Sequence, residues 1–515
     1  MKRAADTELA PNGDGKRRKC PYLDTINHQL LDFDFEKVCS VTLSDQNVYA
    51  CLVCGKYFQG RGKSTHAFTH SVQNGHHVFI NLENDKIYCL PDNYEVVDHS
   101  LAPIKNALRP EFAPEQIAKL DQNRILAQDA FGVSYLPGFI GLNNLKHTDY
   151  VSVAVHALAH VPPLRDFFLL PSNTVGKCKS PLVLRFGELV RKIWSPHNFK
   201  NTISPHEFVQ EVSVSSKKRF HVGTQNECVM FLSWLLNELH RGLGGTSKRG
   251  SSIIHKCFQG LVEVTTTDES KPVPAEPDEN AEPANATTAE TPFLLMSLDL
   301  PSTPLFKDSQ GGNIIPQVPL FTVLEKYDGK TVTHILQGSQ RLKKTYSITS
   351  LPPFLIFHVK RFTRNNFFVE KNPTIVNFPV KNLELREYLK LAEDVPSEEA
   401  LNAMSVSNLR KLLIQHGVSL KDCLEKADLV NRASKISIPS TKYNLIANIC
   451  HDSPVVASNQ TAVTSNPLTE GSYRVHVQNR ATEQWYEIQD LHVQETMPQL
   501  IGVSESYLMI YERKE

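Results

Sequence analysis

The chain has 515 residues, of which 41% are apolar and 21% charged, a composition typical of a globular protein with two or three domains. Its 55 basic and 55 acidic residues cancel, which excludes a global field that would steer the chain to nucleic acid or to a membrane. No apolar run approaches the roughly 20 residues needed to cross a bilayer, and the charged N-terminus lacks the apolar segment of a secretory signal. We therefore expect no membrane partner.

Residues 1–19 carry two basic clusters and are expected to form a disordered tail. The clusters are Lys2-Arg3 and the run from Lys16 to Lys19, with twelve residues between them. This spacing resembles that of a bipartite nuclear import signal, which indicates a nuclear location. A solvated basic tail without any targeting role is the alternative.

Residues 20–110 hold a cluster of cysteines and histidines that indicates a metal site. In a chain without a secretory route, clustered cysteines favour metal binding over disulfides. Cys51 and Cys54 are two residues apart, and His70 and His76 follow 16 and 22 residues after Cys54. Two thiolates and two imidazoles complete the closed tetrahedral shell of a structural zinc. Gly55 allows the tight turn that such a knuckle needs.

Apolar periodicity predicts the elements that follow in the chain. Short strands are expected at 77–82 and 86–90, and residues 111–130 are expected to form a connecting helix that opens with proline. From 131 to 515 helices come first and strands later, which indicates an α+β domain. The expected helices are 151–160, 182–193 and 225–240, and the expected strands are 354–359, 443–449, 473–477 and 507–511.

Residues 265–292 are expected to interrupt the large domain as a flexible acidic loop. The segment is rich in Pro, Ala and Thr and carries seven carboxylates against Lys271 alone. Such a composition cannot bury enough apolar surface to order itself.

Residues 401–434 are expected to form a compact helical insert. Gly417 should end a first helix, and the run from Ser419 to Asp422 resembles a capping box that opens a second one. The pair loosely resembles a SAP-type module, used for nucleic-acid or protein contact, but a plain structural insert is equally compatible. The first helix has one apolar face, made of Val406, Leu409, Leu412 and Leu413.

The metal cluster lies in the motif CLVCGKYFQGRGKSTHAFTHSVQNGHHVFINL, followed by YCLPD. This motif resembles the UBP-type zinc finger, a domain that in many relatives grips the free C-terminal tail of ubiquitin. Three-zinc members have further ligand pairs, which are half missing in this chain, so the resemblance implies a single zinc ion. The remaining ligands and their substituted partners are Cys39 and His66 with Thr42 and Gln59, and Cys20 and Cys89 with Tyr22 and Asp92.

The resemblance also assigns a contact for the ubiquitin tail. Arg61 stands at the position of the arginine that grips the tail carboxylate, a role that suits a guanidinium fork. Of the aromatic residues that flank the tail in the family, Tyr88 is retained, whereas Gly62 and Leu90 replace two others. We therefore expect weak ubiquitin binding or none.

The stretch GLNNLKHTDY at 141–150 resembles the cysteine box of ubiquitin-specific proteases (USPs), roughly GLxNLGNTCY. In that box a turn delivers the nucleophile to a helix N-terminus, where the helix dipole lowers the thiol pKa. Here Asp149 stands at the nucleophile position and His147 at that of the oxyanion-stabilising asparagine. The resemblance therefore implies that the nucleophile is lost.

Further family motifs follow in order and cover most of residues 135–511. The resemblance implies a papain-like USP domain with thumb, palm and fingers behind the small zinc finger. Ser472 stands at the position of the catalytic histidine and Gln489 at that of the orienting acid, so all three triad members are replaced. The motifs are QNECVMFL from 225, PFLLMSLDL from 292, LPPFLIFHVKRF from 351, GSYRVHV from 471 and WYEIQD from 485.

One run of residues imitates a catalytic triad. Cys450, His451 and Asp452 are consecutive at the end of an expected strand. Adjacent side chains of a strand point to opposite faces, so we expect no relay among them.

Five features of the sequence resemble the inactive, splicing-associated branch of the USP family that is linked to the tri-snRNP. They are the segments CPYLDTIN, LDFDFEKVCS and YCLPDNYEVVD and the residues Asp149 and Ser472. That resemblance implies a nuclear scaffold without enzymatic activity that contacts spliceosomal snRNP proteins and supports tri-snRNP assembly or stability. Three alternatives remain: a deubiquitinase with an unconventional site, a ubiquitin receptor, and direct RNA contact through the basic tail or the helical insert.

Overall fold

The computed structural model describes residues 20–268, 286–302, 315–337, 340–364, 369–390, 398–415, 425–434, 440–453 and 466–515, so the basic tail lies outside the described residues. Backbone contacts divide the chain into two compact units. The first contains the residues up to Phe112 together with Ile125–Ile140 and Arg191–Glu207, and the second contains Ala113–Arg124, Gly141–Val190 and Phe208–Glu515. No helix in the described ranges combines the length and the apolar character that a membrane span requires.

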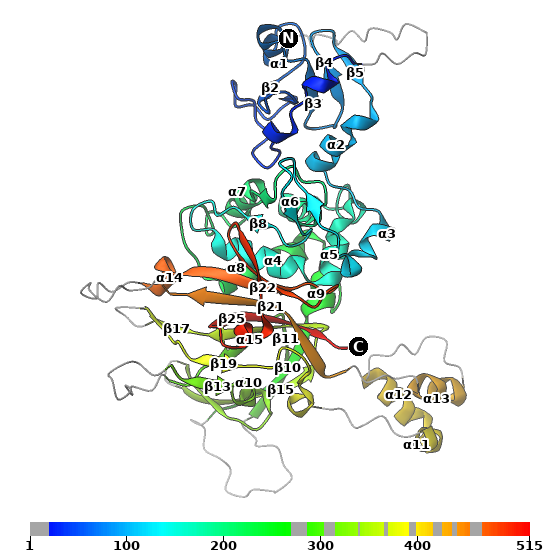
Figure 1. The fold of residues 1–515 in the computed structure, drawn as a ribbon. Helices are drawn as coiled ribbons and strands as arrows, with labels where there is room; N and C mark the ends of the chain where they lie inside the picture. The colour runs from blue at the N-terminus through cyan, green and yellow to red at the C-terminus, as the bar shows by residue number, and fades with distance from the viewer. Residues whose placement is uncertain are drawn as a thin grey trace, which may run out of the picture. The chain divides into compact units, whose positions relative to one another are not determined.

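The first unit is built on a five-stranded antiparallel sheet in the order β2-β1-β3-β4-β5 (Figure 1). The strands expected at 77–82 and 86–90 are β3 and β4, which confirms that part of the prediction. Separate apolar clusters surround the sheet, one of which includes Phe33, Val78 and Ile104. The elements are β1 (Val48–Cys51), β2 (Tyr57–Gln59), α1 (His66–Asn74), β3 (Val78–Asn81), β4 (Ile87–Cys89), β5 (Tyr94–Val96) and α2 (Ala102–Leu108).

Ion pairs join distant segments of the first unit. Lys192 Nζ lies 2.7 Å from Asp34 Oδ1, and Lys200 pairs with Asp32. Asp34 Oδ2 also accepts the backbone N–H of Ser204 at 2.9 Å. The run LDFD therefore anchors a segment that lies some 160 positions later in the chain, beside the short strands β6 (Ala127–Gln128), β7 (Ser134–Tyr135) and β9 (Thr202–Ile203).

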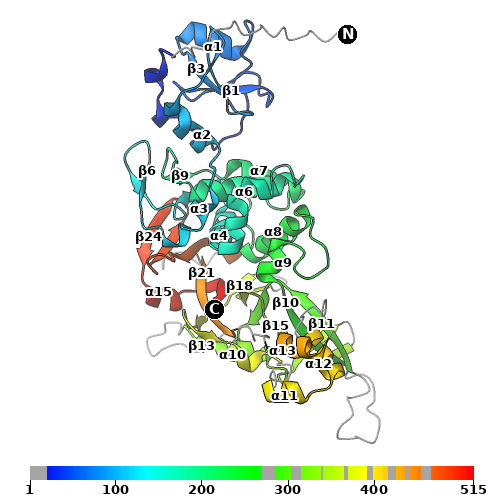
Figure 2. The same ribbon diagram turned by 90° about the vertical axis from the view of Figure 1, so that its right-hand side faces the viewer.

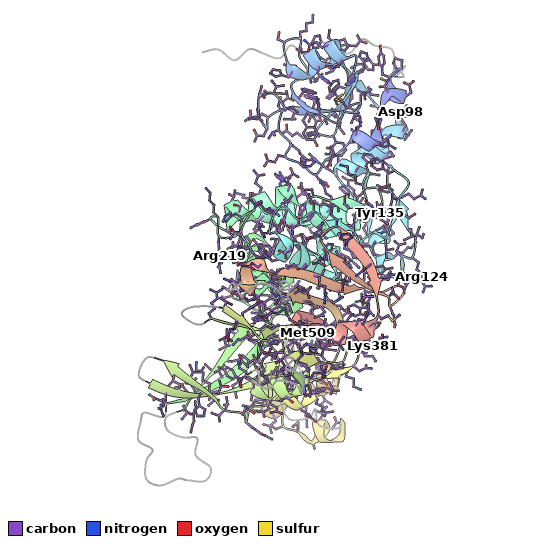
Figure 3. All side chains as sticks on the ribbon, turned by 60° about the vertical axis from the view of Figure 1, so that its left-hand side comes forward. Asp98, Arg124, Tyr135, Arg219, Lys381 and Met509 are labelled. Carbon is purple, nitrogen blue, oxygen red and sulfur yellow. The ribbon has the colours of Figure 1, made fainter. Side chains whose placement is uncertain are left out.

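The connecting helix predicted for 111–130 is wrong. The segment contains only the single turn α3 (Pro114–Ile117) and a 3-10 turn at Leu120–Gln122. Asp121 Oδ1 lies 2.7 Å from Nη1 of Arg165, and Nη2 of Arg124, labelled in Figure 3, donates to Ala481 O at 3.0 Å. These contacts within the second unit hold the segment in an irregular path, and such tertiary contacts override a weak helical periodicity.

The second unit begins with a group of helices. The helices predicted at 151–160, 182–193 and 225–240 are confirmed as α4, α6 and α8, with ends shifted by up to three residues. All eleven residues of α4 are buried, because it packs against α8 and against strands of the central sheet (Figures 1 and 2). The helices are α4 (Asp149–Ala159), α5 (Pro162–Leu169), α6 (Pro181–Trp194), α7 (His206–Ser215), α8 (Cys228–Gly242) and α9 (Ile253–Phe258).

The central sheet runs in the order β12-β16-β25-β21-β22-β23-β24, with β20 paired to β21. All of its pairings are antiparallel except β12 with β16. The four strands predicted after residue 350 are confirmed as β16, β21, β22 and β25. Its strands are β12 (Met296–Asp299), β16 (Phe354–Lys360), β20 (Leu383–Glu384), β21 (Lys442–Asp452), β22 (Ser472–Gln478), β23 (Trp485–Gln489), β24 (His492–Thr496) and β25 (Ser506–Arg513).

A second sheet of this unit corrects the prediction of an acidic loop over 265–292. Both ends of that segment are strands, because β10 (Gly260–Asp268) pairs with β11 (Ala286–Phe293), and β10 also pairs with β15 (Gln340–Ser350). The threonines that we took for loop composition are β-branched and favour strands. Only 269–285 of the predicted loop lie outside the described residues. The sheet order is β11-β10-β15-β14, with β14 at Thr333–Gln337.

The helical insert consists of three short helices with an apolar core of their own (Figure 2). They are α11 (Glu398–Ala403), α12 (Val406–Gln415) and α13 (Lys426–Ser434). Leu409 and Leu413 of the predicted apolar face are buried, whereas Val406 is 40% exposed, which corrects its assignment to that face. The predicted stop at Gly417, the capping box from Ser419 and the side chain of Leu412 lie outside the described residues.

Short elements complete the second unit. β13 (Gln317–Pro319) pairs in parallel with β19 (Ile375–Asn377), and β17 (Phe362–Arg364) forms a hairpin with β18 (Val369–Lys371). The remaining short elements include β8 (Gly141–Leu142), α10 (Leu320–Leu324), α14 (Pro467–Glu470) and α15 (Pro498–Gly502).

Candidate functional site

The four predicted metal ligands lie together in the first unit. Cys51 ends β1, Cys54 follows in the next turn, and His70 and His76 lie within and just after α1. Their ligand atoms all lie within 4.8 Å of one another. Gly55 closes the knuckle with a φ of 73°, and a Cβ there would meet the carbonyl oxygen of residue 30 at 2.1 Å. Only glycine fits this turn.

The donor set fits a zinc ion. Tetrahedral zinc with Zn–S near 2.3 Å and Zn–N near 2.0 Å would place neighbouring ligand atoms about 3.3–3.8 Å apart. The measured separations are 3.5 Å for Cys51 Sγ to His76 Nδ1, 3.4 Å for Cys54 Sγ to His70 Nε2 and 3.0 Å between the two imidazole nitrogens. The hydrogen bond from Cys51 lowers the pKa of Cys54 to about 4 and raises that of Cys51. A divalent cation would take the place of the shared proton.

At one of the two zinc positions predicted to be incomplete, the substituted residues bond to each other. Thr42 Oγ1 donates to Gln59 Oε1 at 3.0 Å beside the buried Cys39. At the other position Cys20 and Cys89 are both buried in one apolar cluster. Within the described ranges, the Cys51 cluster is the only group of three or more His, Cys, Asp or Glu residues that could hold a metal.

Arg61, the predicted contact for the ubiquitin tail, is engaged within the zinc-finger sheet. Its Nη1 donates to Asn93 Oδ1 at 2.5 Å, and its guanidinium carbon lies 4.2 Å from the centre of the Tyr88 ring. A carboxylate ligand would therefore have to compete with Asn93 for this guanidinium.

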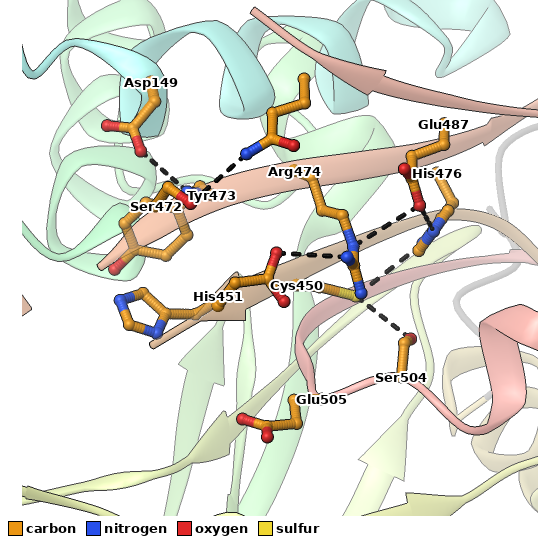
Figure 4. A network of polar contacts seen from close by, with 12 residues as sticks. Asp149, Cys450, His451, Ser472, Tyr473, Arg474, His476, Glu487, Ser504 and Glu505 are labelled. Carbon is orange, nitrogen blue, oxygen red and sulfur yellow. Dashed lines mark hydrogen bonds and ion pairs between the residues drawn. The ribbon is translucent and has the colours of Figure 1, made fainter. Parts of the chain in front are cut away.

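Asp149 lies at the start of α4, and backbone and side-chain donors surround its buried carboxylate. Figure 4 shows its contact with Tyr473. Oδ2 accepts the backbone N–H of Tyr473 at 2.7 Å and the Gln225 amide at 3.2 Å, and Oδ1 accepts the N–H of Tyr150 at 3.0 Å. The same Gln225 amide donates to Gly471 O at 3.1 Å. Burial raises the pKa of Asp149, and the hydrogen bonds offset this only in part. The carboxylate therefore links α4 to β22.

The two residues predicted to stand at the other triad positions also lie close together, at the start of β22. Gln489 Nε2 donates to Ser472 Oγ at 3.3 Å, next to the Tyr473 N–H that binds Asp149. His147 is exposed in the loop before α4 and has a φ of 56°. The structure thus brings Asp149, Ser472 and Gln489 together, but a serine hydroxyl and an amide cannot take up a proton near neutral pH as an imidazole does.

Two residues that hold this arrangement were not predicted to do so. Gln225 was identified only as part of a helical motif, although it bridges Asp149 and Gly471. Asp490 Oδ2 accepts the Asn144 amide at 3.3 Å, which joins the cysteine-box segment to the turn after β23. Both polar residues lie inside motifs that the sequence analysis identified. Their place in those motifs could have indicated that they contact the predicted triad positions.

The prediction for Cys450, His451 and Asp452 agrees with their geometry, but the strand reveals a different array. The His451 ring packs 4.8 Å from that of Tyr473 on the other face of β21. Cys450 Sγ instead lies 3.8 Å from His476 Nδ1, and His476 Nε2 lies 3.0 Å from Glu487 Oε2 (Figure 4). Only the strand register shows that these residues share a face, so the sequence could not reveal the array.

The inner part of this array is closed to solvent, whereas Glu487 at its outer end is 19% exposed. Cys450 is 0% and His476 2% exposed, and Ser504 Oγ covers the sulfur at 3.1 Å. Burial alone would lower the pKa of His476, but its hydrogen bonds to Cys450 and Glu487 raise it to about 9. The hydrogen bond to His476 lowers the pKa of Glu487 to about 2. The pair of the buried His476 imidazolium and the half-buried Glu487 carboxylate thus stabilises the fold at neutral pH.

We expect the stability of the second unit to fall as pH rises from 6.5 to 9. The folded-state pKa of His476 is raised to about 9, so its contribution is complete below 6.5 and is lost as the imidazolium deprotonates. The loss should stay below about 3 kcal/mol in the free energy of unfolding, because the lowered pKa of the Cys450 thiol contributes with the opposite sign over this range. Urea titrations at pH 6.0, 7.5 and 9.0 would measure it. In Glu487→Gln the slope between these values should be clearly smaller, and an equal slope in both proteins would contradict the assignment.

The comparisons with known proteins agree with this architecture. Residues 140–511 match the family described as "Ubiquitin carboxyl-terminal hydrolase", and residues 38–101 match "Zn-finger in ubiquitin-hydrolases and other protein". "Ubiquitin carboxyl-terminal hydrolase 39" of Mus musculus is 45% identical over 98% of this chain and 81% of its own length. "Probable mRNA-splicing protein ubp10" of Schizosaccharomyces pombe is 40% identical over 96% of this chain and 88% of its own length.

A solved structure shares the whole fold. The entity described as "Crystal structure of an essential yeast splicing factor" superposes with a TM-score of 0.69 and 27% identity, and the match covers 96% of this chain and 100% of that one. The family match extends over more than half of the residues, and two close relatives align along almost the entire chain. The chain therefore belongs to the ubiquitin carboxyl-terminal hydrolase family and carries a UBP-type zinc finger in front of its USP domain.

Proposed function

We propose that this protein is a catalytically inactive USP-like scaffold that acts in pre-mRNA splicing in the nucleus and supports assembly or stability of the tri-snRNP. The observation that carries the loss of activity is the Asp149 carboxylate, which three hydrogen-bond donors hold at the nucleophile position. The names of the S. pombe relative and of the yeast structure support the splicing role. Its proposed partners are spliceosomal snRNP proteins.

The chemistry of the three substituted positions supports inactivity. Removing the nucleophile of a protease triad costs about 10⁶ in rate, nearly as much as removing all three members. An aspartate nucleophile would have to form a mixed anhydride from an amide, and Ser472 offers no general acid that could protonate the leaving amine. The Asp149 carboxylate is in addition only 4% exposed.

The Cys450 array does not replace the lost triad. A nucleophile must reach the carbonyl carbon of its substrate, and Cys450 is fully buried under Ser504. Burial raises the pKa of its thiol and its polar contacts, led by the hydrogen bond to His476, together lower it by more, but a sulfur enclosed within a strand cannot reach a substrate. We therefore assign the array a structural role.

We further propose that one structural zinc ion binds Cys51, Cys54, His70 and His76. Four protein ligands leave no open position for a substrate or water, so the ion stabilises the finger and takes no part in a reaction. We propose that any affinity for ubiquitin is weak, because Arg61 already contacts Asn93 and Tyr88.

Purified full-length protein should give no turnover of a ubiquitin C-terminal fluorogenic substrate above a buffer control, because no thiolate or base is present at the substituted positions. Tagged protein from nuclear extract should recover snRNP proteins and small nuclear RNAs, as measured by mass spectrometry and RNA sequencing.

Two results would overturn this proposal. Turnover that disappears in Asp149→Ala or Cys450→Ser would establish an enzyme with an unconventional site. Recovery of ubiquitin conjugates in place of splicing particles, with tail-dependent binding lost in Arg61→Ala, would favour a ubiquitin receptor. Lys63→Ala on the neighbouring exposed loop is the matched control for Arg61→Ala.

A further inference from the structure

Four exposed cations lie on two loops of the second unit that contact each other. Lys217, Lys218 and Arg219 lie in the loop between α7 and α8, and Arg219 is labelled in Figure 3. Lys146 lies in the loop before α4. The backbone N–H of Gly223 donates to Lys146 O at 2.8 Å and so joins the two loops. We call the four cationic side chains the basic surface.

No carboxylate of the described residues neutralises the basic surface. The chain has no Asp or Glu between Asp129 and Asp149, or between Glu211 and Glu227. Glu227 is paired with Arg364 at 2.5 Å, and Asp149 is buried. In the described part of the chain, no carboxylate lies within 4.0 Å of the charged nitrogens of these four cations. A chain with no net charge thus presents a local surplus of positive charge, which attracts anions.

A buried anchor holds the loop between α7 and α8 in place. Phe220 is 1% exposed, and its ring centre lies 6.2 Å from that of Tyr150 and 5.4 Å from that of Phe231. His221 Nδ1 donates to Lys218 O at 2.9 Å, which closes the loop on itself. The backbone beneath the basic surface is therefore preorganised, and a ligand would have to order only the ends of the cationic side chains.

The backbone of both loops adopts a conformation that residues other than glycine rarely take. The φ angles are 75° at Lys146, 56° at His147, 54° at Lys217 and 63° at Lys218. Of the eleven non-glycine residues with positive φ in the described ranges, four thus lie in these two loops. Strained backbone of this kind clusters at sites of function, which favours a binding role over a merely solvated face.

The uncharged side chains of the two loops favour a protein ligand over RNA. Proteins that bind single-stranded RNA stack its bases on exposed aromatic rings, but Phe220 is the only Phe, Tyr or Trp in these loops and is buried. Val214 and Val222 are instead 68% and 45% exposed. Val214 lies next to the cations, because its carbonyl oxygen accepts the N–H of Lys217 at 3.0 Å. Aliphatic contacts beside cations suit an acidic peptide that also carries aliphatic side chains.

We propose that the basic surface docks a segment of a partner protein that is rich in Asp and Glu and carries aliphatic side chains. The carboxylates pair with the four cations, and the aliphatic side chains pack on Val214 and Val222. Ion pairs at an exposed surface are screened by salt, so the affinity falls as ionic strength rises. This inference goes beyond the proposed splicing role and does not depend on it.

The test uses full-length protein and a fluorescein-labelled peptide of glutamates interrupted by single leucines. Fluorescence anisotropy should show saturable binding that weakens as the NaCl concentration rises. A variant in which glutamine replaces all four cations should bind roughly 10- to 20-fold more weakly, because each exposed ion pair contributes a factor of about 2. Its substitutions are Lys146→Gln, Lys217→Gln, Lys218→Gln and Arg219→Gln.

The matched control removes the same charge from four exposed lysines elsewhere in the second unit and should keep the affinity of the wild type. Its substitutions are Lys177→Gln, Lys179→Gln, Lys248→Gln and Lys330→Gln. Urea unfolding of both variants should match that of the wild type, so that a loss of binding does not reflect misfolding. If the first variant is destabilised, Arg219→Glu alone, at a position without a positive φ, should still weaken binding by about 4-fold.

Three results would overturn the proposal. One is the absence of saturable peptide binding to the wild type at low salt. Another is an equal loss of affinity in the basic-surface variant and in the control, which would show attraction by overall charge alone. The third is a labelled uridine oligonucleotide that binds more tightly than the peptide and is lost in the basic-surface variant, which would assign the surface to RNA.

Discussion

Chelation of zinc should unfold the sheet of the first unit while leaving the second unit folded. Cys51 and the two histidines tie β1, α1 and the start of β3 to one point, and without the ion the thiol and imidazole groups cannot hold these elements together. Structural zinc contributes about 10–16 kcal/mol in isolated finger peptides. Apolar clusters on both sides of this sheet remain after chelation, so we expect a smaller but still decisive loss of at least several kcal/mol.

Hydrogen exchange measured peptide by peptide would follow this loss. After treatment with a chelator, peptides covering β1 to β4 should lose protection by several orders of magnitude, whereas those of α8 should not change. Cys54→Ser should reproduce the effect without a chelator, and Cys178→Ser, a half-buried cysteine of the second unit, is the matched control. Unchanged protection of β1 with the zinc demonstrably removed would refute the role that we assign to the cluster.

Replacing Asp149 with alanine should destabilise the second unit by about 2–4 kcal/mol. The change leaves the buried Tyr473 N–H without its acceptor and removes one of the two acceptors of the Gln225 amide, and an unsatisfied buried donor costs about 1–3 kcal/mol. It also removes a negative charge from the first turn of α4, worth about 0.3–1 kcal/mol. Burial raises the pKa of Asp149, which shows that desolvation of the carboxylate offsets part of the stability that its hydrogen bonds provide. We therefore do not expect the substitution to cost more than this range.

Urea unfolding at pH 7 would measure the effect, with Glu387→Ala at an exposed carboxylate as the control. Asp149→Cys should lose a similar amount of stability and still hydrolyse no ubiquitin substrate, because Ser472 and Gln489 provide no base. If Asp149→Ala were as stable as the wild type, the carboxylate could not be the link between α4 and β22. Hydrolysis by Asp149→Cys would show that the residues around position 149 can still support catalysis.

The sequence predicted the elements whose stability comes from their own apolar pattern. α4 and β25 follow from continuous apolar runs, and both were found within a few residues of their predicted ends. The helix at 111–130 failed because Asp121 bonds to Arg165, a contact with a residue 44 positions later. Local periodicity carries no information about such a partner.

In the candidate sites, too, local sequence patterns could be predicted and contacts between distant segments could not. Cys51, Cys54, His70 and His76 could be named because metal ligands follow a fixed spacing along the chain. The contact of Cys450 with His476 could not be predicted, because it depends on how β21 and β22 are aligned. A shift of one residue in their register would turn the two side chains to opposite faces of the sheet.

The interleaving of the two units along the chain determines how the protein can be divided. The boundary between them falls within α6, and residues Arg191–Glu207 contribute to the first unit. A fragment that stops near residue 112 would therefore lack Lys192 and Lys200, leave Asp32 and Asp34 without their cations, and uncover Leu31 and Phe33. Deletion of the finger would likewise leave Lys192 and Lys200 without their acidic partners in the remaining fragment. A loss of function in either truncated protein would therefore reflect misfolding near the point of truncation. Point variants at the metal ligands separate the contribution of the zinc finger from that of the USP domain more reliably.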